Sequence, residues 1–274
     1  MEQERMDAVI RQQYEKCVQL GRALAEGFGM EDIHDFRVET KRFRALLRLT
    51  AVAGHSPIKP KLPNNLKVYY AMTGELRNIQ LQKKALEDAA VRLHLGPPAK
   101  CLAVLDDRIG MTEHMIKLYL GASNPLGREK TQWHDHISAH AADAANEAFI
   151  AGKIKTFTLP GGGDLPDNEQ LHTIRKAMKD LLYAWPYFSK ENIERAIPKG
   201  LPSRKHLETC ARELGDLHDI IVQLSLLKDR NFLLCTCPQS ARFLESAEQL
   251  WCRDKQVLLE KIKGLLLQYE PHVG

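Results

Sequence analysis

HDFRVETKRFRALLRL, residues 34–49, combines an apolar helical face with a dense set of basic side chains. At about 100° per residue of an α-helix, five of its six basic and histidine side chains share a stripe about 80° wide, while Phe36, Phe43, Leu46 and Leu47 lie on the opposite face. With a rise of about 1.5 Å per residue, the stripe is roughly 21 Å long. The segment is therefore predicted to bury one face and to present a line of cations on the other. The stripe holds His34, Arg37, Lys41, Arg44 and Arg48.

A second stretch, HTIRKAMKDLLYAW at residues 172–185, repeats this pattern. Both stretches read H-x-x-R-x-x-x-K, and the second stripe holds His172, Arg175, Lys176 and Lys179. Downstream of each, at nearly the same spacing, GELRN from Gly74 is echoed by GDLHD from Gly215, and we interpret both as helix starts. Two motifs that recur in the same order predict two copies of one helical unit, related by a pseudo-two-fold axis.

The rest of the chain also follows a 3.6-residue period, which predicts an all-α protein built from helical bundles. The 274 residues are 44% hydrophobic and 27% charged, values typical of a globular domain. We expect one domain over residues 1–274, with a first helical repeat at 1–154, a Gly- and Pro-rich linker at 155–168 and a second repeat at 169–274.

Composition also excludes several classes of protein. The net charge is only +4, from 39 Lys and Arg against 35 Asp and Glu, so an anion site has to come from local clustering. No run of eighteen apolar residues and no apolar leader is present, which excludes a membrane-spanning helix and a secretory signal. We interpret the six cysteines as reduced thiols of a cytoplasmic protein, with a redox or zinc role of Cys235 and Cys237 as the alternative.

The charge pattern of the two stripes indicates an anionic ligand. Like charges three or four positions apart destabilise a helix by a few tenths of a kcal/mol per pair, unless an anion faces them. Asp35 and Glu39 lie off the first stripe and are poorly placed to neutralise it. A line of about 21 Å suits an extended polyanion better than a single phosphate. For either helix alone, a solvated Arg-rich face is the alternative.

These motifs resemble the CHAD family, the conserved histidine α-helical domain, over nearly the whole chain. The resemblance implies two pseudo-symmetric bundles of the four-helix type around a central basic channel that binds inorganic polyphosphate, and a location at polyphosphate granules. Asn78 departs from the family's usual Asp, and no E-x-E-x-K motif marks an accompanying triphosphatase domain, so we expect a stand-alone module. The stripes and the resemblance together assign polyphosphate binding to His34, Arg37, Lys41, Arg42, Arg44, Arg48, Arg77, His172, Arg175, Lys176, Lys179 and Lys205. Among these, Arg42, Arg77 and Lys205 rest on the resemblance alone.

Two groups of residues could bind a metal ion, but each also has a simpler role. Glu75, Asp216 and Asp219 could hold Mg²⁺, but carboxylates in the first turn of a helix also stabilise its dipole. The histidines of WHDHISAHA offer an i,i+4 pair for zinc without the general-base Glu of a metalloprotease helix; they are His134, His136 and His140. We therefore expect no metal and no cofactor.

Three functions remain. The first is a non-catalytic polyphosphate-binding module, the second a polyphosphate or nucleotide phosphohydrolase with a metal site, and the third a scaffold that reads the phosphates of RNA or of a protein partner. The stripes carry almost no acids for metal binding and, apart from Tyr183, no aromatics for base stacking. This pattern favours the binding module and disfavours specific nucleic-acid recognition. Because histidine has a reference pKa of about 6.5, we expect binding to strengthen toward acidic pH.

Overall fold

The computed structural model describes residues 3–53, 61–127, 142–157, 165–197, 203–229, 232 and 237–269. Within these ranges every regular element is a helix, and the predicted all-α fold is confirmed. In chain order the elements are α1 (Gln3–Leu24), α2 (Met30–Ala53), α3 (Asn64–Leu93), α4 (Ala99–Ala122), α5 (Ala142–Phe157), α6 (Asn168–Ala184), η3 (Trp185–Tyr187), α7 (Lys190–Ala196), α8 (Arg204–Leu226), α10 (Pro238–Leu266) and η4 (Leu267–Tyr269).

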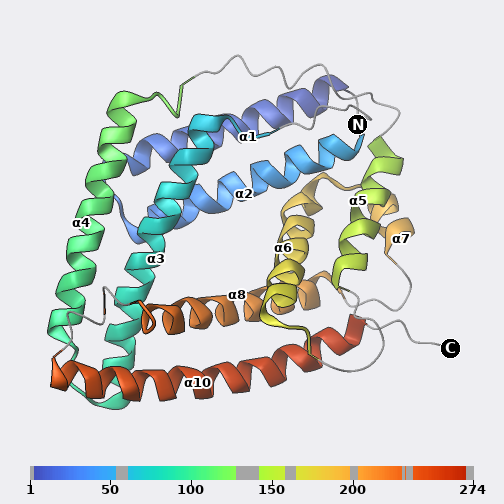
Figure 1. The fold of residues 1–274 in the computed structure, drawn as a ribbon. Coiled ribbons are helices and arrows are strands. Elements are labelled where there is room, and N and C mark those ends of the chain that lie inside the picture. Colours follow the sequence, from blue (N-terminus) through green and yellow to red (C-terminus); the bar gives the residue numbers. More distant parts are fainter. Residues whose placement is uncertain are drawn as a thin grey trace.

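The helices pair along the four sides of a frame (Figure 1). Helix α1 packs on α2, α3 on α4, α5 on α6 and α8 on α10. In each pair one helix lies on the inner side of the frame, and these inner helices are α2, α3, α6 and α8 (Figure 1). The first repeat also touches the second directly, because α2 packs on α6, and α3 packs on α8 and α10.

Buried apolar side chains hold this frame together in four clusters. Among the described residues, one cluster lies among α1, α2, α3 and α4, and a second among α5, α6, α8 and α10. A third joins the halves through residues such as Leu86 of α3, Leu105 of α4 and Trp251 of α10, and a fourth joins Leu49 of α2 to Phe149 of α5. The two repeats therefore share buried surface through the third cluster, and the division into two pseudo-symmetric bundles stays a prediction.

Helix α2 follows the sequence-based assignment of its faces closely. Phe36, Phe43 and Leu46 are fully buried, and Leu47 is nearly so. Their burial against α1 and α3 leaves the opposite face of α2 for the cations. The apolar side predicted from the helical period is therefore confirmed.

Two sequence-based interpretations need correction. Gly74 lies inside α3 and Gly215 inside α8, so neither motif is a helix start. Helix α5 extends to Phe157, so the first residues assigned to the linker are helical. Helix α6 begins at Asn168, where the Asp167 side chain accepts a hydrogen bond from the backbone N–H of Gln170 and completes a capping box. Residues 158–164 lie outside the described ranges.

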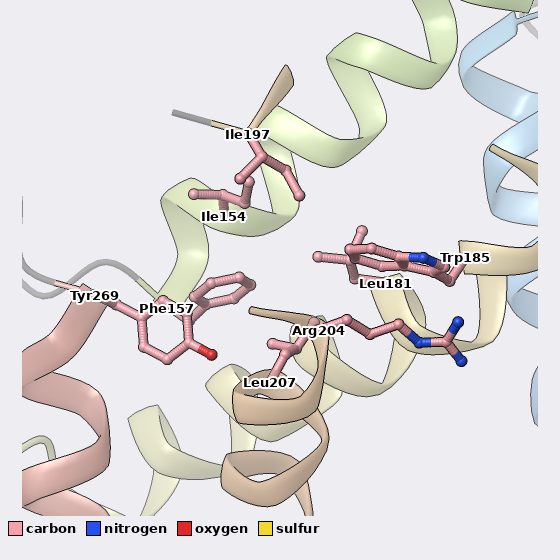
Figure 2. A pocket seen from close by; sticks show the side chains of 8 residues that line it. All are labelled: Ile154, Phe157, Leu181, Trp185, Ile197, Arg204, Leu207 and Tyr269. Atoms are coloured by element: carbon pink, nitrogen blue, oxygen red, sulfur yellow. The ribbon is translucent and has the colours of Figure 1, made fainter. Parts of the chain in front are cut away.

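A small apolar pocket sits where α5, α6, α8 and η4 meet (Figure 2). Its volume is about 20 Å³, which gives room for about one water molecule. The hydroxyl of Tyr269 borders it and has no hydrogen-bond partner within the described residues. The Arg204 guanidinium lies 5.6 Å from the Trp185 ring at its edge. The pocket is therefore too small for an organic ligand and belongs to the packing of this corner.

Within the described residues, no helix combines the length and the hydropathy that crossing a membrane requires.

We predict that Leu86→Ala lowers the free energy of unfolding by about 3 kcal/mol, because it opens a cavity in the cluster that joins the two halves. Leu86 is fully buried, whereas Leu118 of α4 is 54% exposed. The control Leu118→Ala is expected to change stability by less than about 0.5 kcal/mol. Urea denaturation followed by circular dichroism measures both variants, and equal losses would contradict the shared core.

Candidate functional site

A cavity of about 400 Å³ lies between the inner helices α2, α3, α6 and α8. Eight lysine and arginine side chains line it against two aspartates, which leaves an excess of six positive charges with histidine neutral. Besides Val38, Asn78 and Leu81, the lining consists of His34, Arg37, Lys41, Arg44, Arg48, Tyr70, Arg77, His172, Arg175, Lys176, Lys179, Asp180, Tyr183, His218 and Asp219. Such a concentration of cations favours an anion in the cavity.

Ten of the twelve side chains assigned from the sequence line this cavity. The two others, Arg42 and Lys205, lie outside it. Arg42 points toward α1, where its Nη1 donates to the Glu39 carboxylate at 2.9 Å. Lys205 is exposed in the first turn of α8. Both assignments rested on the resemblance alone, and a helical wheel already places Arg42 off the cationic stripe.

Eight lining residues were not assigned from the sequence as ligands, and three of them carry aromatic rings: Tyr70, Tyr183 and His218. The repeat contains the signal for one of them, because His218 occupies in GDLHD the position that Arg77 occupies in GELRN. Tyr70 carries no such signal, since its role depends on the packing of α3 against α2. Only the tertiary structure brings it to the cavity.

Arg37 is held against α3 by three contacts. Its Nη1 donates to the backbone carbonyl of Tyr70 at 2.6 Å, and its guanidinium lies 4.3 Å from the centre of the Tyr70 ring. A Cβ on Gly74 would come within 2.8 Å of the Arg37 Cζ. Glycine therefore allows the Arg37 guanidinium to lie this close to α3, which gives the glycine of the GELRN motif a structural role.

The second half repeats this arrangement more loosely. A Cβ on Gly215 of α8 would lie 3.8 Å from the Nε of Arg175. This Nε is buried and makes no hydrogen bond within the described residues. In each half, the arginine of H-x-x-R thus lies against the glycine of the downstream motif, and this contact links the two repeated motifs physically.

Acidic side chains neutralise only part of the cavity. At one end Asp180 binds Arg48 at 2.5 Å and Lys153 of α5 at 2.7 Å. Lys41, by contrast, is half-buried among cations; burial, reinforced by Arg37, Arg175 and Lys179, lowers its pKa to about 8. Burial and Arg175 also lower the pKa of Lys179. These shifts record a cavity whose charge is not compensated from within.

Two histidines from different helices stack inside the cavity. The ring centres of His172 and His218 are 5.1 Å apart, with the ring planes 29° from parallel. Burial, together with Arg175 and His172, lowers the pKa of His218 to about 4. Burial likewise lowers the pKa values of His34 and His172. In the unliganded protein the pKa values of these three histidines therefore lie below the reference value of about 6.5, on which the expected pH dependence of binding rests.

The candidate metal sites receive no support where they can be examined. Among the described residues, no group of three or more His, Cys, Asp or Glu side chains is arranged to hold a metal ion. Glu75, Asp216 and Asp219 are among these described residues. The WHDHISAHA histidines and Cys235 lie outside the described ranges, while Cys237 places its Sγ 3.3 Å from the Ser240 Oγ. Cys17 and Cys210 are buried free thiols.

The frame and its cavity define an all-helical protein with a cationic centre. The sequence matches the model of the CHAD domain over residues 8–228, and the chain belongs to the CHAD family. Its fold is similar to that in the crystal structure of the CHAD domain from the plant Ricinus communis, with a TM-score of 0.60 and 20% sequence identity over 97% of this chain and 91% of that chain. No curated protein sequence matches.

We predict that the folded protein gains stability as the pH rises from about 4 to about 6.5. His218 stays neutral in the folded chain over this range, whereas in the unfolded chain it binds a proton below its ordinary pKa of about 6.5. His218→Gln removes this difference and flattens the profile. The exposed His114 of α4 provides the control, since His114→Gln is expected to leave the profile unchanged. Thermal unfolding at several pH values measures the slopes, and identical slopes for His218→Gln and the wild type would refute the assignment.

Proposed function

We propose that the cavity binds inorganic polyphosphate, without turning it over. The observation that carries this proposal is the convergence of eight lysine and arginine side chains from α2, α3 and α6 on one cavity with only two acids. Membership of the CHAD family agrees with it. Under this proposal the space inside the frame serves as a basic channel, and the protein gathers at polyphosphate granules.

Within the site, Arg37, Lys41, Arg44, Arg175 and Lys179 would contact phosphate oxygens directly. Arginine offers paired N–H donors that match two oxygens of one phosphate, while lysine acts as a point charge. The Nε of Arg175 has a free donor that a phosphate oxygen would satisfy. The neutral imidazoles of His172 and His218 can each donate one N–H.

The phosphohydrolase alternative lacks the acids that it needs. Phosphoryl transfer relies on carboxylates that hold metal ions beside the reacting phosphate. Of the two aspartates lining the cavity, Asp180 is already paired with Arg48 and Lys153. Asp219 alone is left, and one carboxylate is a poor metal site.

The RNA-reading alternative would have to use the two tyrosine rings that line the cavity, those of Tyr70 and Tyr183. Single-stranded RNA is bound by stacking bases on such faces. Tyr70 does line the cavity, but the guanidinium of Arg37 lies 4.3 Å from its ring centre and that of Arg44 5.6 Å. A ligand that needs no base stacking therefore suits this cavity better.

A competition titration tests the proposal directly. Long-chain polyphosphate, RNA, heparin and ATP compete for the protein at fixed ionic strength, and the affinities are then compared over a salt series. We expect preference for polyphosphate and an affinity that falls steeply with salt, since a bound polyanion releases counterions. Equal binding of all four polyanions, or an affinity insensitive to salt, would contradict the proposal. Release of orthophosphate would favour the enzyme.

We predict that Lys41→Glu combined with Lys179→Glu lowers polyphosphate affinity at least about 100-fold, equivalent to about 3 kcal/mol, while the fold survives. Both lysines line the cavity and neither belongs to an apolar cluster. Lys205→Glu is the matched control, because this exposed lysine lies outside the cavity. The affinity of the Lys205→Glu protein for polyphosphate is expected to stay within about twofold of the wild type. Fluorescence titration measures binding and circular dichroism the fold. Unfolding of the double variant would show that these lysines are structural.

We predict that Gly74→Ala weakens polyphosphate binding about fivefold with little loss of stability. The new methyl group displaces the Arg37 guanidinium from the Tyr70 carbonyl, while alanine favours the helix by about 1 kcal/mol. Gly110→Ala is the control, because nothing lies within 4 Å of a Cβ there. It is expected to gain stability and to bind normally. Equal affinities of the two variants would mean that the placement of Arg37 is unimportant.

A further inference from the structure

Lys41 stands in an unusual environment for a lysine. It is half-buried on α2 and faces Arg37 on its own helix, Arg175 and Lys179 on α6, and Arg77 on α3. From α8, His218 and Asp219 face it as well. Within the described residues Lys41 takes part in no ion pair, whereas Lys153 and Lys261 bind carboxylates at 2.7 and 2.8 Å. Its amine is thus directed into an anion-attracting cavity without a fixed partner.

We propose that Lys41 is a covalent modification site for acyl phosphates, small electrophiles that carry a phosphate on an acyl group. The surrounding cations bind the phosphate and bring the acyl carbon to the lysine amine. The Nζ lone pair attacks this carbon, the bond from carbon to the phosphate oxygen breaks, and phosphate leaves with the electron pair. The nitrogen loses a proton to solvent, and the products are an amide on Lys41 and inorganic phosphate.

The same environment makes Lys41 more reactive than an exposed lysine. Burial and the neighbouring cations lower its pKa to about 8, against 10.5 for a free lysine, so the neutral amine is about 300-fold more abundant at pH 7. A weaker base is also a weaker nucleophile, by analogy with thiols, and this cancels about one power of ten. The gain over an exposed lysine is therefore about tenfold or more.

Modification would regulate the proposed binding function. Acylation removes one of the eight positive side chains at the cavity and fills part of its volume. A bound polyphosphate chain in turn blocks access to the Lys41 amine. Its negative charge also raises the pKa of this amine and so favours the protonated, unreactive form. Binding and modification are thus mutually exclusive, and an abundant acyl phosphate would release polyphosphate.

The test is a time course with acetyl phosphate on the full chain, with acetylation quantified lysine by lysine by peptide mass spectrometry. We expect Lys41 to react at least about tenfold faster than two internal controls, with a rate that rises with pH to a midpoint near 8. Lys176 lines the same cavity but is exposed, and Lys205 is exposed outside it. If Lys41 reacts no faster than Lys176 and Lys205, the inference is wrong.

A second arm separates this inference from the proposed function, on which its regulatory consequence rests. Polyphosphate added beforehand is expected to protect Lys41 at least about fivefold and to leave Lys205 unaffected. Selective acetylation without protection would support the modification site and contradict polyphosphate binding. In Lys41→Arg, which keeps the charge, acetyl phosphate is expected to leave polyphosphate affinity unchanged, while it lowers that of the wild type. An equal loss of affinity in both proteins would overturn the assignment to Lys41.

Discussion

Like-charge repulsion inside one cavity is the constraint around which this CHAD domain is built. Eight lysine and arginine side chains face a common space, and the fold places most acids elsewhere. Glu39 is buried on the α1 side of α2, where Lys16 and Arg42 bind it, and Glu213 of α8 binds Lys261 on the outer side. Acids that could neutralise the cavity thus stabilise the outer contacts instead. Burial, reinforced by the neighbouring cations, lowers the pKa values of Lys41 and Lys179.

Apolar packing between the helix pairs has to offset this repulsion. Each inner helix packs on one outer helix, which is α1, α4, α5 or α10 (Figure 1). Helix α10 lies beyond the part of the chain that matches the family model, yet it contributes Trp251 to the cluster that joins the halves and Ile262 to the cluster of the second half. The frame therefore needs this last helix, and the cavity exists because buried surface is shared across all four sides.

The sequence predicted the helical class and most of the cavity because helical period alone fixes which side chains share a face. That rule correctly placed Arg37 and Lys41 opposite Phe36 and Phe43. It could not identify the helix that faces the stripe, so Tyr70 was missed. The same limit applies to Gly74, for which the sequence wrongly predicted a helix start. Glycine usually punctuates helices, and its role inside α3 is visible only once Arg37 lies against it.

Arg42 shows why the direction of a charge matters more than its presence. It directly follows Lys41 in the sequence, but one helical step of about 100° turns it from the cavity to the α1 side, where it binds Glu39. The two neighbouring cations therefore differ in their surroundings: Arg42 is paired with a carboxylate of its own helix, while Lys41 lies among like charges. A count of basic residues in the motif treats them as equal. An incoming anion stabilises the cavity cations that have no acidic partner within the described residues far more than it stabilises a paired cation such as Arg42. The proposed function depends on these unpaired cations.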